Sequence, residues 1–222
     1  MDAAGKPGFF ITFEGPEGGG KSTQIHRLAA ALAEEGYVVW TTREPGGTRL
    51  GEMIRPLLLG PQQTRLSPWT EALLFTAARA ELVDEVIRPR LQRGEVVLCD
   101  RFSDSTLAYQ GYGRGLDLKT LQGLQAEATG SLTPDRTLLL NLPVEAGLAR
   151  IPRNAQDRLD RETVAFHRRV HAGYEQMAAE DPQRWRQVDA SADPDQVARR
   201  ILEEALAALR QAGVHPAQRR SA

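Results

Sequence analysis

Cysteine is the scarcest residue in this chain: among 222 residues, only Cys99 carries a thiol. A single cysteine excludes a disulfide within the chain, which fits a protein kept in a reducing compartment. Long apolar runs are missing too. No stretch reaches the roughly 20 residues needed to span a bilayer, and the first residues lack the basic and then apolar layout of a secretory signal. We therefore expect a cytoplasmic protein with no membrane partner.

An excess of positive charge is also missing. The sequence has 28 lysines and arginines against 29 aspartates and glutamates, which gives a formal net charge of −1. A protein that binds nucleic acid through its phosphate backbone usually carries a basic excess, so we expect no nucleic-acid partner. Hydrophobic residues make up 41% of the chain, enough to bury a core in one domain of this length.

What the chain does have is an alternation of apolar runs and helical patterns. Five runs are predicted strands: 9–13, 37–42, 95–99, 136–141 and 185–188. Apolar residues at helical spacing predict helices at 21–35, 48–58, 68–93, 103–110, 117–129, 143–150, 156–180 and 194–211. Apolar strands joined by helical crossovers predict an α/β fold with a parallel sheet buried on both faces. We expect one domain spanning 1–222, with its core at about 9–211 and flexible tails at 1–8 and 212–222.

The strongest motif follows the first predicted strand. Its pattern is G-x-x-x-x-G-K-[ST], and its residues are Gly15, Pro16, Glu17, Gly18, Gly19, Gly20, Lys21, Ser22 and Thr23. A strand that ends in glycines and then opens a helix directs backbone N–H groups and the positive helix end at one point, which suits a polyphosphate. Lys21 is expected to reach the β- and γ-phosphates, and the Ser22 hydroxyl to bind Mg²⁺. Because strand, lysine and helix are all present, we favour a nucleoside triphosphate site over an empty glycine-rich turn.

A second motif ends the third predicted strand. Residues 96–100 are four apolar residues followed by Asp100, the pattern of a strand that places a carboxylate beside Mg²⁺. Without the glycine-rich motif, a solvated turn acid would explain Asp100 equally well. Arg101 follows at once, and an acid beside a cation indicates that two phosphate-bearing ligands meet here. The chain has no Asn-Lys-x-Asp motif for guanine, which counts against a GTPase switch.

Further motifs resemble, in order, those of the bacterial thymidylate kinase family. They lie at 43–48 (REPGGT), 74–79 (LFTAAR), 100–102 (DRF), 105–111 (STLAYQG), 113–115 (GRG) and 157–159 (DRL). The resemblance implies a three-layer P-loop nucleoside monophosphate kinase fold with a five-stranded parallel sheet. It implies transfer of the γ-phosphoryl group of Mg·ATP to dTMP, giving dTDP and ADP for dTTP synthesis. It also implies a homodimer, for which the apolar faces of helices 48–58 and 68–93 are the expected contact surfaces.

The resemblance assigns the nucleoside pocket to two helices. Phe75 and Arg79 lie four residues apart on one helix face, where a ring can stack on a pyrimidine and a guanidinium can donate to its O4. Cytosine has an amino donor at that position, so this pair would reject it. Thr106, Tyr109 and Gln110 share a face of the next helix, and Tyr109 is implied to lie against the sugar and favour deoxyribose. Alone, Phe75 would be a core residue, Arg79 a solvated cation and Tyr109 a packing residue.

Three further residues are implied to contact the acceptor nucleotide. Glu17 is an unusual acid in a loop that binds anions, and the family implies that it accepts a hydrogen bond from the 3′-hydroxyl group. Arg43 and Arg101 each follow a predicted strand, and a guanidinium fork matches the oxygens of the acceptor monophosphate. The alternatives are a loop acid that points to solvent and two surface cations.

The segment at about 150–160 resembles the mobile lid of the family. A proline interrupts its helical pattern, and a basic, polar stretch follows. The glycine-rich loop has no arginine, so the resemblance implies that Arg153 and Arg158 supply cations for the transferring phosphoryl group. The expected catalytic residues are thus Lys21, Arg101, Arg153 and Arg158. Without the resemblance, this segment would be a charged helix face on which Asp157 pairs with Arg161.

Arg150, at the start of this segment, is implied to stack on adenine, with the loop 188–191 on the other side of the base. The chain departs from the family at two positions. Asp160 stands where the lid usually has a longer Glu, which leaves the lid contacts open. Asn141 stands where the fourth strand often has Asp, and the sequence offers no physical reason for it.

Two other functions and one metal pattern remain as alternatives. A deoxynucleoside kinase would phosphorylate thymidine, whose 5′-hydroxyl group needs a base, and Glu44 is the candidate. A nucleotide-dependent switch would hydrolyse ATP slowly and need a protein partner. His167 and His171 have the i, i+4 spacing of two metal ligands, but without a third ligand a solvated helix face is the favoured interpretation.

Overall fold

Five strands form one parallel sheet in the computed structural model, which describes residues 8–60 and 65–216. They are β1 (Phe9–Glu14), β2 (Val39–Arg43), β3 (Val96–Asp100), β4 (Arg136–Asn141) and β5 (Trp185–Asp189). Their order is β2-β3-β1-β4-β5, and every neighbouring pair is parallel. The predicted parallel sheet is confirmed, and each predicted strand coincides with an observed one. Most of the two predicted tails lies outside the described residues.

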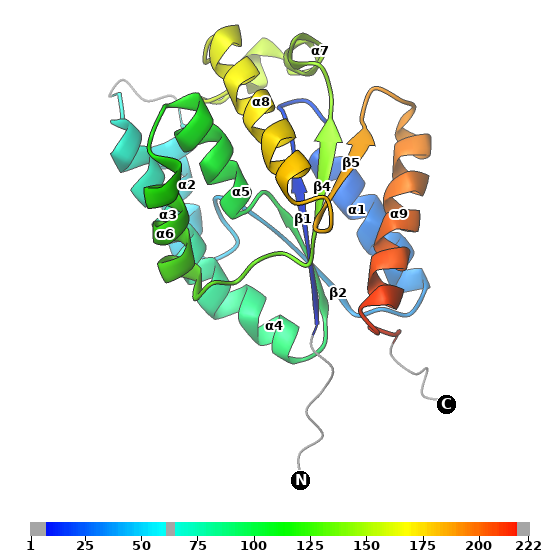
Figure 1. The fold of residues 1–222 in the computed structure, drawn as a ribbon. Helices are drawn as coiled ribbons and strands as arrows, with labels where there is room; N and C mark the ends of the chain where they lie inside the picture. The colour runs from blue at the N-terminus through cyan, green and yellow to red at the C-terminus, as the bar shows by residue number, and fades with distance from the viewer. Residues whose placement is uncertain (1–7, 61–64, 217–222) are drawn as a thin grey trace.

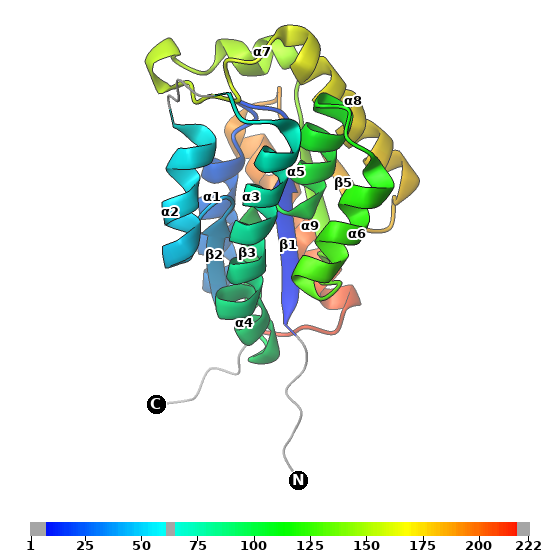
Figure 2. The same cartoon turned by 90° about the vertical axis from the view of Figure 1, so that its left-hand side faces the viewer.

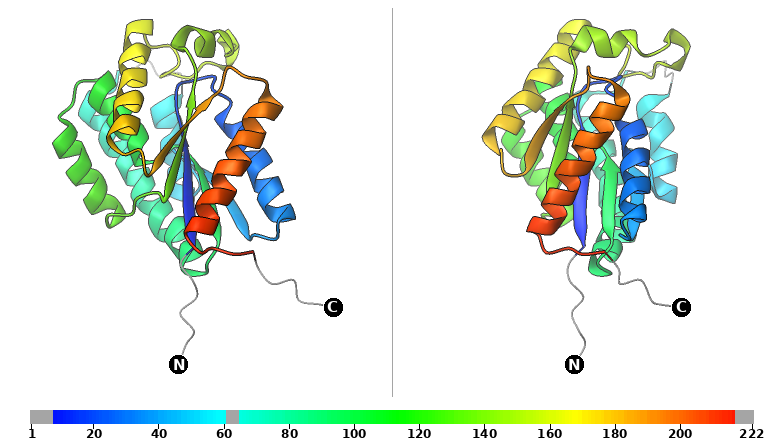
Figure 3. Two further views of the ribbon diagram at one scale, coloured as in Figure 1. Left: turned by 45° about the vertical axis from the view of Figure 1, so that its right-hand side comes forward. Right: turned by 90° about the vertical axis from the view of Figure 1, so that its right-hand side faces the viewer.

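Helices cover both faces of the sheet (Figure 1). On one face lie α1 (Lys21–Glu34) and α9 (Pro194–Gln211), which pack against each other (Figure 3). On the other lie α3 (Pro68–Leu82), α6 (Leu118–Thr129) and α8 (Val164–Glu180), and α2 (Arg49–Leu59) packs against α3 (Figure 2). The shorter elements are η1 (Val83–Ile87), α4 (Arg88–Gln92), α5 (Ser103–Thr106), η2 (Leu107–Gly113), α7 (Val144–Ala149) and η3 (Arg153–Ala155).

The central strand β1 explains why both faces need helices. Successive residues of a strand point to opposite faces, so its alternate side chains enter different cores. Phe9, Ile11 and Phe13 pack with α1 and α9. Phe10 packs on the opposite face, where its ring meets Phe102 edge to face with centroids 5.0 Å apart. The carboxyl end of β1, which carries the glycine-rich loop, is therefore fixed between two packed layers. Among the helices of the described residues, none is long and apolar enough to cross a membrane.

Three predicted helices differ from the observed ones. The helix predicted at 103–110 is α5 followed by the π-helical η2, which ends at Gly113. The run predicted at 68–93 is α3, a π-helical turn (η1) and α4 in succession. The helix predicted at 156–180 begins only at Val164, because the preceding residues form a turn. There Asp157 Oδ1 accepts hydrogen bonds from the backbone N–H groups of Leu159 and Asp160, at 2.8 and 2.9 Å. Such side-chain bonds compete with helical backbone bonds, so the expected helical pairing of Asp157 with Arg161 is wrong.

Candidate active site

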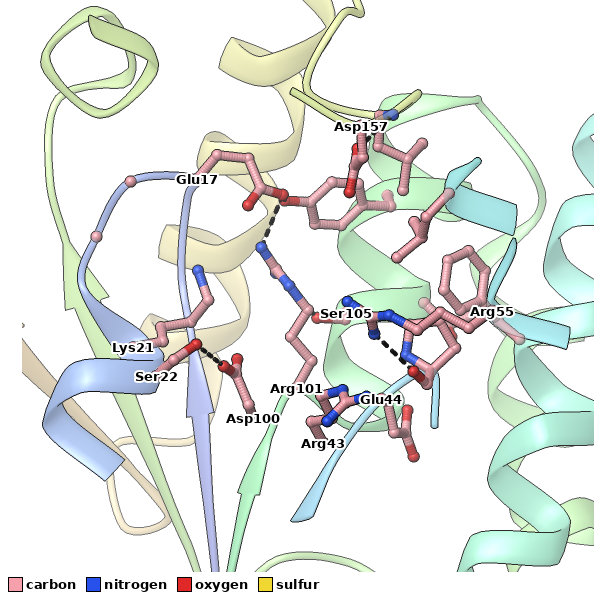
Figure 4. Close-up of a pocket in the computed structure, with 18 of the residues that line it drawn as sticks. Glu17, Lys21, Ser22, Arg43, Glu44, Arg55, Asp100, Arg101, Ser105 and Asp157 are labelled. Atoms are coloured by element: carbon pink, nitrogen blue, oxygen red, sulfur yellow. Dashed lines mark hydrogen bonds and ion pairs between the residues drawn. The ribbon is translucent and has the colours of Figure 1, made fainter. Parts of the chain in front are cut away.

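A cavity of about 360 Å³ opens at the carboxyl ends of β1, β2 and β3 (Figure 4). Parallel α/β sheets commonly bind their ligands at this edge. Residues 17–23 of the glycine-rich loop and Asp100 line the cavity. The residues expected to bind the acceptor nucleotide line it as well: Glu17, Arg43, Phe75, Arg79, Arg101, Thr106, Tyr109 and Gln110.

The glycine-rich loop turns sharply between β1 and α1. Gly15, Gly18 and Gly20 have φ angles of 130°, 69° and 80°, a region that side-chain-bearing residues rarely adopt. A Cβ atom at Gly18 would also lie 2.1 Å from the carbonyl oxygen of Gly147, so only glycine fits there. The loop therefore brings its backbone close to α7 while it leads into the N-terminus of α1.

Lys21 and Ser22 begin α1 and face the cavity (Figure 4). The Lys21 ammonium donates to the carbonyl oxygens of Gly15 and Pro16, at 3.1 and 2.8 Å. The Ser22 hydroxyl donates to Asp100 Oδ2 over 2.6 Å, which joins the loop to the end of β3. The structure thus brings together the lysine, the hydroxyl and the carboxylate of the two strongest motifs. In the described part of the chain, no three His, Cys, Asp or Glu side chains form a ready metal cluster.

Glu17 lies at the centre of a charged group on the wall of the cavity. One carboxylate oxygen, Oε1, accepts from Arg101 over 2.7 Å and from the Tyr109 hydroxyl over 2.5 Å. Burial favours the neutral acid, but Arg101, Lys21 and the Tyr109 bond outweigh it and lower the pKa of Glu17 to about 2. Glu17 is therefore an ionised hydrogen-bond acceptor at neutral pH, and the alternative of a loop acid pointing to solvent is wrong.

Arg79 is only 1% exposed, so the alternative of a solvated cation is wrong. Its Nε donates to both carboxylate oxygens of Glu44, at 2.9 and 2.8 Å, and its other donors reach Glu44, Thr106, Gln125 and the carbonyl of Phe102. Glu44, the candidate base of the thymidine-phosphorylating alternative, is thus occupied as the acceptor for a buried guanidinium. Gln125 was missed because no sequence motif marks a single glutamine on α6.

The outer part of the cavity holds three side chains from α2, α3 and the end of β2. Phe75 is half-buried against other apolar residues and still lines the cavity. Arg43 is more exposed, and its guanidinium lies 2.9 Å from Glu52 Oε1. Arg55 lines the cavity as well and donates to the Pro45 carbonyl over 2.7 Å. The sequence analysis missed Arg55, for which the only signal is an arginine among the apolar residues of α2.

Arg150 ends α7 beside the glycine-rich loop. Its guanidinium donates to the carbonyl oxygen of Gly18 over 3.3 Å and to that of Ala190 over 3.2 Å. The structure therefore places Arg150 against the glycine-rich loop and against the loop 188–191, the segment that was expected on the other side of adenine.

The other two lid arginines lie outside the lining of the cavity. Arg158 donates to the Leu58 carbonyl over 2.7 Å and to Glu71 Oε2 over 2.6 Å, and Glu71 is only 1% exposed. Arg153 is exposed in η3. The lid residues that do line the cavity are Asp157 and Leu159. The structure thus brings the lid to the cavity without placing its two predicted catalytic cations there.

The solvated histidine face favoured for α8 is wrong for His167, which is 4% exposed and lies against the Phe166 ring. His171 lies closer to the surface, with Nε2 2.6 Å from Asn141 Oδ1. This contact gives Asn141, one of the two departures from the family pattern, a partner on α8.

Comparisons with known proteins agree with this geometry. A family model described as thymidylate kinase matches residues 13–201. The chain is 61% identical over 192 residues to a thymidylate kinase of Thermomicrobium roseum, covering 86% of this chain and 90% of that one. It is 51% identical over 191 residues to the thymidylate kinase of Deinococcus radiodurans, covering 86% and 92%. The crystal structure of thymidylate kinase from Ehrlichia chaffeensis superposes with a TM-score of 0.72 at 35% identity, covering 90% of this chain and 99% of that one. This chain belongs to the thymidylate kinase family.

Proposed function

We propose that this chain transfers the γ-phosphoryl group of ATP to dTMP, giving dTDP and ADP, a step in dTTP biosynthesis. The observation that carries the proposal is the one cavity lined by a glycine-rich phosphate loop, by Arg101 and by the Phe75–Arg79 pair. The reaction would run in the cytoplasm, where the lone Cys99 stays reduced.

Residues 15–23 would hold the phosphates of ATP. The free N–H groups and the positive end of α1 favour anions, and Lys21 would turn from the loop carbonyls to the β- and γ-phosphates. The Ser22 hydroxyl and the Asp100 carboxylate lie 2.6 Å apart and are the oxygen ligands that Mg²⁺ prefers, so these two residues would hold the ion. Bound there, Mg²⁺ would neutralise charge on the β- and γ-phosphates.

The acceptor phosphate would lie between Arg101 and Arg43. A phosphate monoester has its second pKa near about 6, so it is largely a dianion at neutral pH and needs no base to attack. The protein has to align two anions and cancel their repulsion, which suits a cavity rich in cations. Glu17, with its pKa lowered to about 2, would accept a hydrogen bond from the 3′-hydroxyl group. Tyr109, which donates to Glu17, would fill the space that a 2′-hydroxyl group needs.

The thymine base would lie between Phe75 and Arg79. Glu44 and Gln125 fix the direction of the Arg79 guanidinium. Its five N–H groups already donate within the protein, so one of them would have to exchange its acceptor, for example Thr106 on the cavity wall, for O4 of the base. A donor fixed in this way would discriminate between a carbonyl and an amino group. Thr106 and Gln110 would complete this side of the pocket.

We propose that the chain works as one domain, 1–222, with a lid at about 150–160. Arg150, which lies between Gly18 and Ala190, would stack on adenine. Arg153 and Arg158 would reach the transferring phosphoryl group once the lid has moved, because interactions needed only during transfer are best made only then.

The deciding experiment measures ADP release from Mg·ATP with dTMP, dUMP, dCMP, thymidine or no acceptor. We expect fast release with dTMP and kcat/KM lower by about 10-fold to 200-fold for dUMP, which lacks one methyl group. In dCMP the base presents an amino group, which is a donor like Arg79. We therefore expect its kcat/KM to be lower by at least about 10³-fold. Equal kcat/KM for dCMP and dTMP would remove Arg79 from the base pocket. Preference for thymidine, or slow release independent of acceptor, would instead favour the two alternative functions.

We also propose that the chain forms a homodimer through α2 and α3. These helices pack side by side and carry most of the exposed large apolar side chains of the described residues: Leu50, Met53, Leu57, Trp69 and Leu73. Exposed apolar patches of this kind mark protein contacts. Sedimentation of the wild type and of Leu73→Glu tests this: the wild type should sediment as a dimer and the variant as a monomer.

A further inference from the structure

Behind the cavity wall lies a buried carboxylate that no motif accounts for. Glu14 is the last residue of β1 and is completely buried, outside the lining of the cavity. Its Oε1 accepts from the backbone N–H of Phe102 over 2.8 Å. Its Oε2 accepts from the Ser105 hydroxyl over 2.6 Å and from the Tyr174 hydroxyl over 2.9 Å. Three elements that are distant in sequence thus meet at one carboxylate.

The same two hydroxyl groups also contact Arg101. Arg101 Nη1 lies 3.0 Å from the Tyr174 hydroxyl and 3.3 Å from the Ser105 hydroxyl. A guanidinium only donates and an ionised carboxylate only accepts. The two hydroxyl groups also lie 2.8 Å from each other, so either could donate to the other. An ionised Glu14 favours both protons on its own side, which leaves the lone pairs of the hydroxyl groups for Arg101. Glu14 in this way sets the direction of the acceptors that Arg101 meets.

Arg101 has a backbone conformation that depends on such partners. Its φ of 70° is in the left-handed region, where a side-chain-bearing residue persists only when its surroundings hold it. Nη1 donates to the two hydroxyl groups that contact Glu14 and to the Gly15 carbonyl, and Nη2 donates to Glu17 on the cavity wall. One end of the guanidinium fork is thus fixed behind the wall, while the other faces the space proposed for the acceptor phosphate.

Charged groups from several elements surround Glu14. Burial and then Asp104 raise the pKa of Glu14 to about 7, against the opposing effect of Arg101. Asp104 itself is paired with Arg184 over 2.6 Å. The negative charge of Glu14 also acts on the pKa values of Lys21, Tyr109 and Cys99. Glu14 therefore changes its charge close to neutral pH.

We propose that Glu14, through the hydroxyl groups of Ser105 and Tyr174, is a positioning residue that aims Arg101 at the transferring phosphoryl group. The proposal rests on the proposed function, since it presumes that Arg101 acts on phosphate. A cation misplaced by about 1 Å costs transfer on the order of 100-fold, while a bound anion tolerates the same displacement better. Loss of the carboxylate should therefore reduce kcat much more than it weakens dTMP binding.

The test compares Glu14→Gln with the wild type and with Asp135→Asn. Asp135 is a matched control because its carboxylate accepts the Phe10 N–H at the other end of β1, away from Arg101. Thermal unfolding and circular dichroism give the folded fraction, and kcat is expressed per folded site. We expect kcat of Glu14→Gln to fall about 10-fold to 100-fold with KM for dTMP changed less than about threefold, and the control to stay at the wild-type value. An unchanged kcat per folded site in Glu14→Gln would overturn the proposal.

A pH profile of kcat distinguishes a positioning role of Glu14 from a purely structural role. The wild type should lose kcat as the pH falls below about 7, and this limb should be missing in Glu14→Gln, while any limb due to dTMP itself stays in both. Superimposable profiles would overturn the proposal.

A second variant tests the proposal if Glu14→Gln fails to fold. Ser105→Ala combined with Tyr174→Phe keeps the carboxylate and should give the same fall in kcat. Wild-type kcat in that variant would overturn the proposal. A wild type that transfers nothing to dTMP would instead refute the proposed function.

Discussion

The wall of the cavity and the lid above it carry similar charges but hold them differently. On the wall, Glu17 and Arg101 lie in the segments after β1 and β3, and Lys21 begins α1. All three lie at one edge of a sheet that is packed on both faces, and each is hydrogen-bonded to its neighbours. In the lid, Arg153 is exposed and Arg158 is paired with Glu71 outside the lining of the cavity. In the proposed function, the sheet would preorganise the groups that bind both ground and transition states. The groups needed only during transfer would come from a segment that has to move.

The acids of the two regions show the same difference. On the wall, cations outweigh burial and lower the pKa of Glu17 to about 2. In the lid, burial and then Glu17 raise the pKa of Asp160 to about 6, because the opposing effects of the Asp157 N–H group and of Arg101 are too weak to compensate. On the wall, the negative charge of Glu17 is compensated by neighbouring cations, whereas the lid places the Asp160 carboxylate near the Glu17 carboxylate.

The largest expected effect comes from breaking the wall. Lys21→Ala removes the cation proposed for the β- and γ-phosphates and should lower kcat at least about 10³-fold, or about 4 kcal/mol in activation free energy. The fold should persist because α1 is anchored by its apolar residues. Steady-state kinetics and circular dichroism check both. Lys119→Ala, on α6, is the control and should keep wild-type kcat. A folded Lys21→Ala that keeps more than about a tenth of wild-type kcat would contradict the assignment.

A smaller loss is expected from the lid. Arg158→Ala and Arg153→Ala should lower kcat about 100-fold and about 10-fold, with little change in dTMP affinity measured by calorimetry. Arg158 is expected to matter more because it lies within the Asp-Arg-Leu motif. Arg161→Ala, which changes an exposed arginine next to the lid, is the control. If both variants keep wild-type kcat, the lid arginines are surface charges and the comparison between wall and lid loses its functional meaning.

These two regions also differ in how far the sequence predicts them. The glycine-rich loop, Asp100 and Arg101 follow buried strands, and the carboxyl ends of parallel strands converge, so their meeting was predictable. The lid was predicted as part of a long helix because its apolar spacing is helical. Its actual turn comes from Asp157 capping its own segment, which spacing does not reveal.

The sequence also did not predict the contacts that tertiary packing brings together. Gln125 and Glu44 orient Arg79, and Glu14 contacts Arg101 only through hydroxyl groups from two other elements. None of these contacts lies within a motif, since each joins residues separated by at least one whole secondary-structure element. Sequence patterns therefore indicated residues that line the cavity but not those that hold them in place.

The attachment of the lid gives a third, structural effect. Glu71 is 1% exposed and accepts hydrogen bonds from Gln110, Arg114 and Arg158. Glu71→Gln removes the anion that Arg158 and Arg114 share and leaves Arg114 only its more exposed partner Glu162, so the free energy of unfolding should fall by about 3 kcal/mol, the low end for a broken buried pair. Urea denaturation measures it. Glu162→Gln removes a more exposed partner of Arg114 and should cost less than about 1 kcal/mol. Equal losses would mean that burial at Glu71 does not matter.

The smallest effect tests the acid of the lid. The folded chain binds the Asp160 proton more tightly than the unfolded chain, because the pKa rises from 3.8 to about 6. Ionisation therefore weakens the fold as the pH rises from about 4 through 6, and Asp160→Asn should abolish this loss. We expect the variant to be more stable by about 1 kcal/mol at pH 7, after allowance for solvent screening, and equal to the wild type at pH 4. Denaturation at pH 4, 5, 6 and 7 measures the difference, with Asp84→Asn as an exposed control. A variant that is less stable at pH 7, or a difference that does not change with pH, would show that Asp160 serves the turn through its hydrogen bond to the Asp157 N–H and not through its charge.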